Sequence, residues 1–396
     1  DASRESMGMG VVTSWLVLVL VVLVLSRGAR GNDHPHQTCQ VQGLPVIDIG
    51  PLLQSGGERT PAGEQAVKEV GDASQSFGFF YITNHGVPEA LQERLERASK
   101  AFFMLPPDRK RAIAMSTGGK AWRGYFSVGE EVTSGLVDQK EGLYLGVEKD
   151  AQDPRPLHGA NLYPKEVPEL REAVEAYMKN MESLGHVLMR AISTSLGLQP
   201  EHFGDQFREP LQLFRIFNYP PHDDRWGADS WAVGEHSDYG YLTLLKQDNS
   251  GGLQVRNTSA VRSDPWAWID VPPLPGTLVV NLGDALEHNS GGLLRATPHR
   301  VQQRRNATEG RLSFPFFFDP SFDAELKDVV PHLSPDLQAR AKFRRAAHSG
   351  RWDGKRVEVF QGTYGDYVLA KVSKVFPQLA EANEILRLKE SSEAPR

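Results

Sequence analysis

The segment GEHSDYGYLTLL, residues 234–245, carries two side chains that can bind a metal ion. His236 and Asp238 stand two positions apart at what we read as the start of a β-strand, where residues i and i+2 point to the same face. A second such pair, His222 and Asp224, follows Pro-Pro among turn-forming residues, which indicates a loop. The first pair could instead lie on a solvated strand edge. Only a third ligand nearby would favour a metal site over this alternative.

Two later histidines are candidates for that third ligand. His288 lies in the turn-rich LEHNSGG, whereas His299 falls in LRATPHRVQ, which reads as a strand. The interval from Asp238 to His299 leaves room for the intervening strands to lead the chain back beside the first two ligands. Two histidines and one carboxylate on one face suit Fe(II) and leave three coordination positions open for substrate chemistry.

A carboxylate-binding pair follows shortly after the third ligand. Arg311 and Ser313, in RLSF, share a face by the same strand period. A guanidinium fork beside a hydroxyl can clamp a carboxylate. A surface salt bridge is the ordinary interpretation of a lone arginine, but four elements in order on predicted strands make a site the better hypothesis.

Short strands separated by Gly and Pro turns must position these residues. They begin at residue 211 and read LQLFRIFNY, YLTLLKQD, GLQVRN, WAWIDV, TLVVNLG, LRATPHRVQ and RLSFPFFFD. Strands at this spacing predict an antiparallel sandwich or barrel, for which a jelly roll is the simplest form. In the last strand the run Phe314, Phe316, Phe317 and Phe318 is expected to be mostly core, with part of it walling a pocket.

The first half of the chain mixes strands with helices. LPVIDI and FGFFYITNHG read as strands, and PAGEQAVKEVGDASQS and VPEALQERLERASKAFF as helices. Residues 167–197 show an apolar stripe at helical spacing, opened by Pro168 and closed by Gly197, and residues 363–376 return to helix. We expect a mainly β fold with a double-stranded β-helix (jelly-roll) core and long helices packed outside.

Composition narrows the class of partner. The net charge of the 396-residue chain is −6 and its pI is near 6.1, so no basic footprint for nucleic acid is present. A small-molecule substrate fits better, and we expect a monomer. Cys39 is the only cysteine, which excludes an intramolecular disulfide and a cysteine-based zinc site.

The N-terminal segment predicts targeting. The run WLVLVLVVLVL, residues 15–25, is shorter than a bilayer span and typical of a signal peptide, with a small-residue cleavage site before Asn32. We expect the secretory pathway, lumenal or extracellular, with no stable membrane association once the leader is cleaved. An uncleaved anchor, a plastid leader and a cytoplasmic location are alternatives. The sequons at Asn257 and Asn306 are compatible with a lumenal route.

The ordered set of motifs resembles the Fe(II)/2-oxoglutarate-dependent oxygenases, in particular their isopenicillin N synthase-like branch. The N-terminal motifs are LPVIDIGPLL, GFFYITNHGV and FFMLPPDRK; those of the core are GEHSDYGYLTLL, GGLQVRN, VVNLGDALEHNSGG, ATPHRV and RLSFPFFFDP. We divide the chain by this resemblance into a leader (1–31), a linker (32–43), an N-terminal dioxygenase region (44–160), a support helix (161–200), the catalytic jelly roll (201–360) and a C-terminal helix and tail (361–396).

The resemblance implies a role for each site residue. His236, Asp238 and His299 match the iron ligands, and Arg311 with Ser313 matches the pair that holds the distal carboxylate of 2-oxoglutarate. Tyr219 matches a tyrosine that assists that carboxylate. The family's frequent Asn two positions earlier is Phe217 here, and the neighbouring Asn218 is not assigned.

A further likeness covers RGYFSVGEEVTSG, residues 123–135, which is similar to the ethylene-forming type of member. It implies that Glu131 and Tyr239 contact the substrate and that Arg215 lies near the metal-bound end of 2-oxoglutarate. For Glu131, a solvated loop carboxylate is an equally good interpretation.

The implied reaction is hydroxylation or desaturation of a small organic molecule, with 2-oxoglutarate and O₂ consumed, succinate and CO₂ released, and ascorbate as a candidate reductant. Three alternatives remain: an iron oxidase of the same fold that does not use 2-oxoglutarate, a metal-free jelly-roll binding protein, and a lumenal protein hydroxylase.

Overall fold

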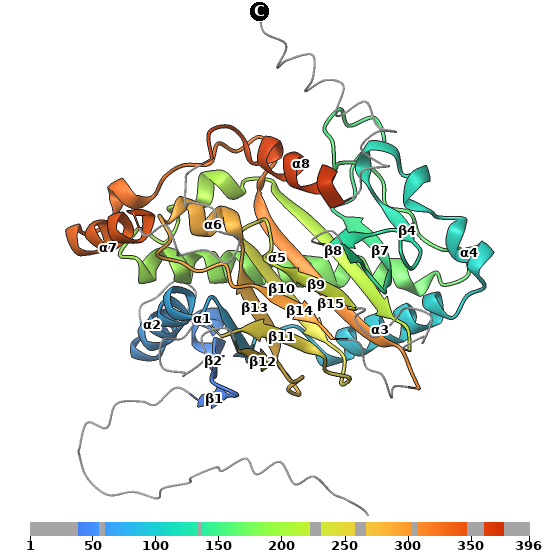
Figure 1. The fold of residues 1–396 in the computed structure, drawn as a ribbon, viewed down its shortest axis with the longest axis horizontal. Coiled ribbons are helices and arrows are strands. Elements are labelled where there is room, and N and C mark those ends of the chain that lie inside the picture. The colour runs from blue at the N-terminus through green and yellow to red at the C-terminus, as the bar shows by residue number, and fades with distance from the viewer. Residues whose placement is uncertain are drawn as a thin grey trace, which may run out of the picture. The chain divides into compact units, whose positions relative to one another are not determined.

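A larger and a smaller β-sheet form the centre of the protein, as seen in a computed structural model (Figure 1). The structure describes residues 39–54, 60–133, 136–221, 231–257, 267–302, 308–346 and 360–375. The expected leader, the decoy pair His222 and Asp224, and the sequon at Asn306 lie outside these residues.

The larger sheet has nine strands, and all neighbours are antiparallel except β2 and β3. Their order is β1 (Cys39–Val41), β2 (Leu44–Asp48), β3 (Phe79–Thr83), β13 (Leu278–Leu282), β10 (Leu242–Gln247), β15 (Arg311–Ser321), β8 (Pro210–Tyr219), β7 (Glu141–Gly146) and β4 (Gly124–Phe126).

The smaller sheet has four strands in the order β12 (Trp268–Asp270), β11 (Leu253–Arg256), β14 (His299–Val301) and β9 (Val233–His236). A short hairpin, β5 (Val132–Thr133) and β6 (Leu136–Val137), stands apart from both sheets in the pairing but contacts β9. The two sheets confirm the double-stranded β-helix expected from the sequence, as a sandwich and not as a closed barrel.

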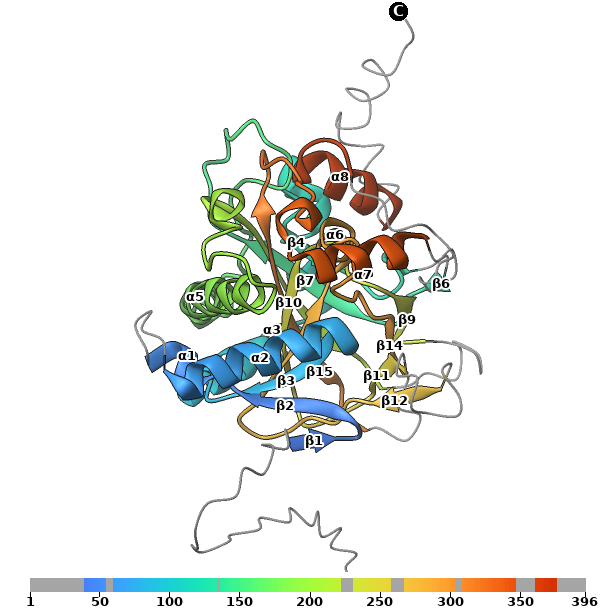
Figure 2. The same ribbon diagram turned by 90° about the vertical axis from the view of Figure 1, so that its left-hand side faces the viewer.

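Eight helices occur among the described residues: α1 (Gly50–Gln54), α2 (Pro61–Ser76), α3 (Glu89–Phe103), α4 (Pro107–Arg111), α5 (Glu169–Ser195), α6 (Asp284–Asn289), α7 (Pro335–Ala346) and α8 (Tyr364–Val375). Short 3₁₀ turns lie at Met115–Thr117, Gly119–Ala121, Gly204–Phe207 and Val330–His332. Figures 1 and 2 show α2, α3 and α5 on one side of the larger sheet. None of the described helices is long and apolar enough to cross a membrane.

The support helix α5 follows the predicted stripe. Its apolar residues at helical spacing are all buried and pack against α2, α3 and β15; they are Leu170, Val174, Met178, Met181, Leu184, Leu188 and Ile192. Gly185 allows α5 to lie close to β15, because a Cβ at that position would lie 2.5 Å from the ring of Phe318. The absence of a side chain at Gly185 therefore sets the distance between helix and sheet.

Several local expectations were wrong. The strand containing His236 ends at that residue and does not begin there, so Asp238 lies in the turn between β9 and β10. Cys39 belongs to β1, inside the segment expected to be linker. The turn-rich segment after Leu282 contains the short helix α6.

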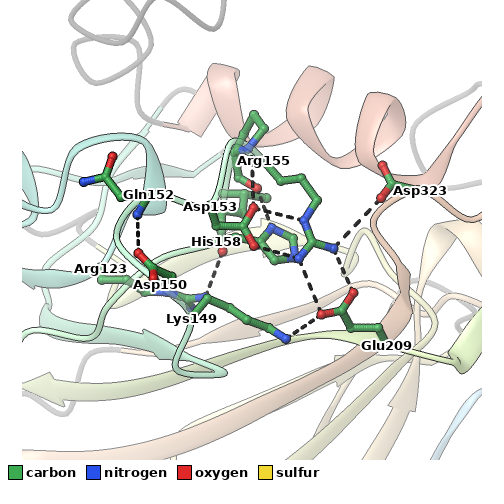
Figure 3. A network of polar contacts seen from close by, with 11 residues as sticks. Arg123, Lys149, Asp150, Gln152, Asp153, Arg155, His158, Glu209 and Asp323 are labelled. Carbon is green, nitrogen blue, oxygen red and sulfur yellow. Dashed lines mark hydrogen bonds and ion pairs between the residues drawn. The ribbon is translucent and has the colours of Figure 1, made fainter.

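A network of ion pairs fastens the loop after β7 to the start of β8 (Figure 3). Arg155 donates 2.7 Å and 2.8 Å hydrogen bonds to Asp153 and Glu209, and Lys149 also pairs with Glu209. Glu209 immediately precedes β8, which carries Tyr219 and Arg215. Because these side chains are partly exposed, each pair adds little to stability, and the network acts mainly by fixing the loop's position.

Candidate metal centre

The three expected metal ligands meet where β9 and β14 run side by side. His236 and His299 are directly opposed in the antiparallel pairing, and their ring centroids lie 4.3 Å apart. The Nε2 atoms of His236 and His299 lie 3.9 Å and 3.8 Å from Oδ1 of Asp238. One ligand atom from each residue falls within 4.8 Å of the others, and no other group of this kind occurs among the described residues.

Backbone and side-chain contacts orient each ligand toward this point. The Nδ1 atoms of His236 and His299 lie 2.8 Å and 3.2 Å from the carbonyl oxygens of Gly234 and Thr297. With a proton on Nδ1, each Nε2 presents its lone pair to a metal.

The two oxygens of the Asp238 carboxylate have different surroundings. Its Oδ2 accepts hydrogen bonds from the Thr243 hydroxyl and, at 2.7 Å, from the Asn281 amide. Oδ1 is the atom that faces both histidines. One oxygen is therefore held by the protein and the other is available to a metal.

Protonation states agree with a metal site. Burial lowers the pKa of His236 and, together with the neighbouring His236, lowers that of His299 to about 4. Burial opposes ionisation of Asp238, but the two histidines and the hydrogen bonds outweigh it and hold its pKa below the usual range. Two neutral imidazoles and a carboxylate are the forms in which these side chains bind a divalent cation.

Arg311 lies in the same cavity with an unpaired charge. Its side chain is 2% exposed, and Nε and both terminal nitrogens are buried without a hydrogen-bond partner. Its guanidinium carbon lies 4.8 Å from the centre of the Tyr219 ring, and Ser313 is two positions further along β15, on the same cavity wall. An uncompensated buried cation is costly, so the arrangement fits an anionic ligand that completes it.

The cavity joins these groups into one space. Its empty volume, together with the open solvent at its mouth, is about 1100 Å³, and its walls come from both sheets and from α8. Phe317 lines it, whereas Phe314, Phe316 and Phe318 are core residues with no exposed surface, so the aromatic run is divided largely as expected.

Glu131 is buried in the cavity wall, so the solvated-loop interpretation was wrong. It is 4% exposed, accepts a 2.8 Å hydrogen bond from the Tyr144 hydroxyl, and lies 2.9 Å from Nζ of Lys140. Arg215 lies 3.9 Å away and stacks on the Tyr144 ring. Tyr239 lines the same space, and burial raises the pKa of its hydroxyl to about 12.

Three features at or behind this wall were not anticipated from the sequence: Lys140, its partner Asp138, and the contribution of α8. Lys140 bridges the carboxylates of Glu131 and Asp138. Burial alone would lower the pKa of Lys140, but the two negative charges outweigh it and raise that pKa. The charged run DQKE before an apolar strand was the available signal, but it resembles an ordinary solvated turn. The third feature is α8, which lines the cavity with Tyr364, Val368 and Val372.

Alternation along β8 explains the departure at Phe217. Arg215, Phe217 and Tyr219 line the cavity, while Asn218 points to the other face and donates a 2.8 Å hydrogen bond to Glu141. Leaving Asn218 outside the site was therefore correct in geometry.

Two family models match the chain. Residues 44–166 match the non-haem dioxygenase in morphine synthesis N-terminal family, and residues 210–320 match the 2OG-Fe(II) oxygenase superfamily.

Similar curated proteins and solved structures span nearly the whole chain. A probable iron/ascorbate oxidoreductase of Dictyostelium discoideum is 40% identical, covering 86% of this chain and 96% of that protein. A 1-aminocyclopropane-1-carboxylate oxidase of the same organism is 33% identical, covering 85% of this chain and 96% of that protein. A homoarginine-6-hydroxylase of Glycine max is also 33% identical, covering 79% of this chain and 96% of that protein. A full-length Neurospora crassa protein, solved in complex with α-ketoglutarate and thymine, is 25% identical with a TM-score of 0.67, covering 85% of this chain and 99% of that one.

Proposed function

The chain belongs to the 2OG-Fe(II) oxygenase superfamily, and from this premise we propose that it oxidises a small zwitterionic amino acid. It is an iron- and 2-oxoglutarate-dependent oxidoreductase that hydroxylates or desaturates a small organic molecule, releasing succinate and CO₂. Within the superfamily we propose a place in the isopenicillin N synthase-like branch, on the motifs given above.

The site residues fit the expected cofactors. We assign the iron to His236, Asp238 and His299, because they are the one group of described residues that can hold a metal. Bound iron and 2-oxoglutarate together supply the activation of O₂ at the expense of oxidative decarboxylation of the 2-oxoglutarate. The chain itself binds and orients the reactants.

We assign the distal carboxylate of 2-oxoglutarate to Arg311, with Ser313 and Tyr219 beside it. Unpaired guanidinium nitrogens in a buried wall provide the fork that a carboxylate needs. Arg215 lies on the same face of β8, nearer to Glu131, and we assign it to the other, metal-bound end of the cosubstrate.

One observation supports the zwitterionic substrate: opposite charges are held close together in the wall of the cavity. Glu131 and Lys140 form an ion pair there, and Arg215 lies beside them. The cluster has both signs, so a substrate with one strong net charge would be left uncompensated at one end. The relatives named for 1-aminocyclopropane-1-carboxylate and homoarginine have amino acids in their names, which agrees with this class.

Screening tests the proposal. The purified chain from Asn32, loaded with Fe(II), is supplied with 2-oxoglutarate and single amino acids, amines or dicarboxylates, and succinate formation is measured. Stimulation by amino acids, lost on Glu131→Gln, is expected. Stimulation only by amines or dicarboxylates would refute the substrate class, and product formation without stoichiometric succinate would favour the oxidase alternative.

We also propose that residues 1–31 direct the protein into the secretory pathway. The apolar run at residues 15–25 and the small residues before Asn32 support this. The sequon at Asn257 gives it no support, because that side chain is completely buried. Expression in a secretory host, followed by N-terminal sequencing, tests the proposal; an intact leader on a retained protein would contradict it.

A further inference from the structure

Helix α8 forms one wall of the active-site cavity. Tyr364, Val368 and Val372 recur at intervals of four, which places them on one face of the helix, and all three line the cavity. On the other side Asp366 and Ala370 are exposed. Figure 1 shows α8 beside β15, and the two elements are in contact.

Lys371 joins this helix to α6. Its Nζ lies 3.3 Å from Oδ2 of Asp284, and 5.5 Å from the centre of the Tyr239 ring. The Asp284 side chain is only 4% exposed, whereas that of Lys371 is 25% exposed. The ion pair is therefore sheltered at its carboxylate end and accessible at its ammonium end.

Asp284 in turn contacts the turn between His236 and Asp238. Its Oδ1 accepts a 2.7 Å hydrogen bond from the Ser237 hydroxyl, and its backbone amide donates a 2.8 Å hydrogen bond to the Asp238 carbonyl. A continuous set of contacts thus leads from Lys371 through Asp284 and Ser237 to the two neighbouring metal ligands. The backbone bond remains when the lysine is removed, so the ligands do not depend on the lysine for their own position.

We propose that Lys371 is a positioning residue that holds α8 against the metal-ligand turn, and that Val368 and Val372 limit the size of the substrate next to the metal. The inference rests on the proposed function. Loss of the ion pair frees α8 to move away from the cavity, which weakens substrate contacts and admits water to the site. The residues assigned to 2-oxoglutarate, Arg311 and Ser313, lie at the start of β15, whereas Gly365 of α8 donates a hydrogen bond to the Phe322 carbonyl just beyond the other end of that strand, so binding of 2-oxoglutarate is expected to stay unchanged.

Lys371→Met tests the positioning role, because methionine retains most of the apolar stem and removes the charge. Lys342→Met on α7 is the matched control, since that lysine is exposed. We measure the Michaelis constants for the amino acid selected by the screen and for the cosubstrate, and the ratio of succinate to oxidised product. Lys371→Met is expected to raise the amino-acid Michaelis constant and the succinate excess about tenfold, as for loss of one partly sheltered charged contact, with the cosubstrate's Michaelis constant unchanged.

Rescue separates positioning from general damage. Lys371→Arg keeps the charge and is expected to restore the coupling of succinate formation to product formation. Thermal unfolding checks that each variant is folded. Equal coupling in Lys371→Met, Lys342→Met and the unmodified enzyme would overturn the inference. A parallel rise in the cosubstrate's Michaelis constant would do so too, because it would indicate a disturbed site as a whole.

The size limit has its own test. Val368→Ala enlarges the cavity, whereas Leu369→Ala alters the same helix at a residue that does not line the cavity. Only Val368→Ala is expected to shift preference toward amino acids with longer side chains, and an equal shift in both variants would refute the role of this face.

Succinate formation without any added substrate keeps the two proposals distinguishable. Lys371→Met is expected to raise this basal rate, because water reaches the site more easily. If no amino acid stimulates the unmodified enzyme but the basal rate still responds to Lys371→Met, the substrate class fails and the role of Lys371 stands. If amino acids stimulate succinate formation but Lys371→Met changes neither the basal rate nor the ratio of succinate to oxidised product, the substrate class stands and the role of Lys371 fails.

Discussion

Replacing Arg311 by lysine changes the shape of a buried cation without changing its charge. The guanidinium of Arg311 is enclosed, with its three nitrogens unpaired and the Tyr219 ring 4.8 Å away. Lysine keeps one positive charge but loses the planar fork that donates two parallel hydrogen bonds to a carboxylate. Charge-assisted hydrogen bonds contribute about 1.5–3 kcal/mol each, so the loss of one lowers affinity for 2-oxoglutarate roughly tenfold to a hundredfold.

Anaerobic titration measures this loss directly. 2-Oxoglutarate is added to the Fe(II) protein and the metal-to-ligand charge-transfer band is followed for the unmodified protein, Arg311→Lys and Ser313→Ala. Arg340→Lys on the exposed part of α7 is the matched control and is expected to be silent. Ser313→Ala is expected to weaken binding less than Arg311→Lys, and Fe(II) affinity is expected to change little in all of them.

The same residue also predicts a stability effect of opposite sign. Without ligand, the buried charge of Arg311 is uncompensated, so Arg311→Met should stabilise the ligand-free protein by about 1–4 kcal/mol in urea unfolding. An unshifted midpoint for 2-oxoglutarate in Arg311→Lys would refute the clamp and favour the oxidase alternative. A destabilised Arg311→Met would contradict the conclusion that this buried charge is uncompensated.

Three further predictions concern the metal, a buried acid and the support helix. His236→Ala or His299→Ala should abolish Fe(II) binding, measured by metal analysis, while His222→Ala should not; iron retained without His299 would contradict the ligand set. Burial raises the pKa of Asp319 to about 7, so its ionisation destabilises the fold increasingly as pH rises from about 4 to above 7, by at most about 4 kcal/mol. The variant Asp319→Asn can still accept the hydrogen bond from the Tyr241 amide, and in urea unfolding it should stabilise the protein more at pH 8.5 than at pH 5. Equal stabilisation at the two pH values would refute this prediction. Gly185→Ala places a Cβ against Phe318 and should lower the free energy of unfolding by about 1–3 kcal/mol, as overpacking does, whereas Ala176→Gly on the same helix should cost only about 1 kcal/mol through helix propensity.

The metal ligands and Arg311 were predictable because each combines a reactive side-chain type with a recognisable strand. The detailed reason for the His236 and Asp238 pairing was nevertheless wrong. They meet because β9 ends and the chain turns, with Asn281 from β13 holding the carboxylate, and not because they alternate along one strand. The motif identified residues that meet in the structure, and tertiary packing determined their geometry.

Contacts between distant segments were not predictable in the same way. Glu131 is a loop residue that is buried against Tyr144 of β7, Arg215 of β8 and Lys140, the residue before β7, and these two strands pair only in the folded sheet. The cavity face of α8 reads in the sequence as an ordinary amphipathic helix. Its partner Asp284 lies on a short helix that the turn-rich sequence concealed. Local periodicity contains no information on such partners.

The cavity draws on three separate supports, and this separation has an evolutionary consequence. The metal ligands lie on β9, β14 and the turn after β9, the residues assigned to 2-oxoglutarate lie on β8 and β15, and the third wall is α8. A substitution at Val368 or Val372 changes the space for substrate without moving a metal ligand or the clamp. Lineages with this architecture can therefore acquire new substrates through drift in one peripheral helix while the oxidising machinery is inherited intact.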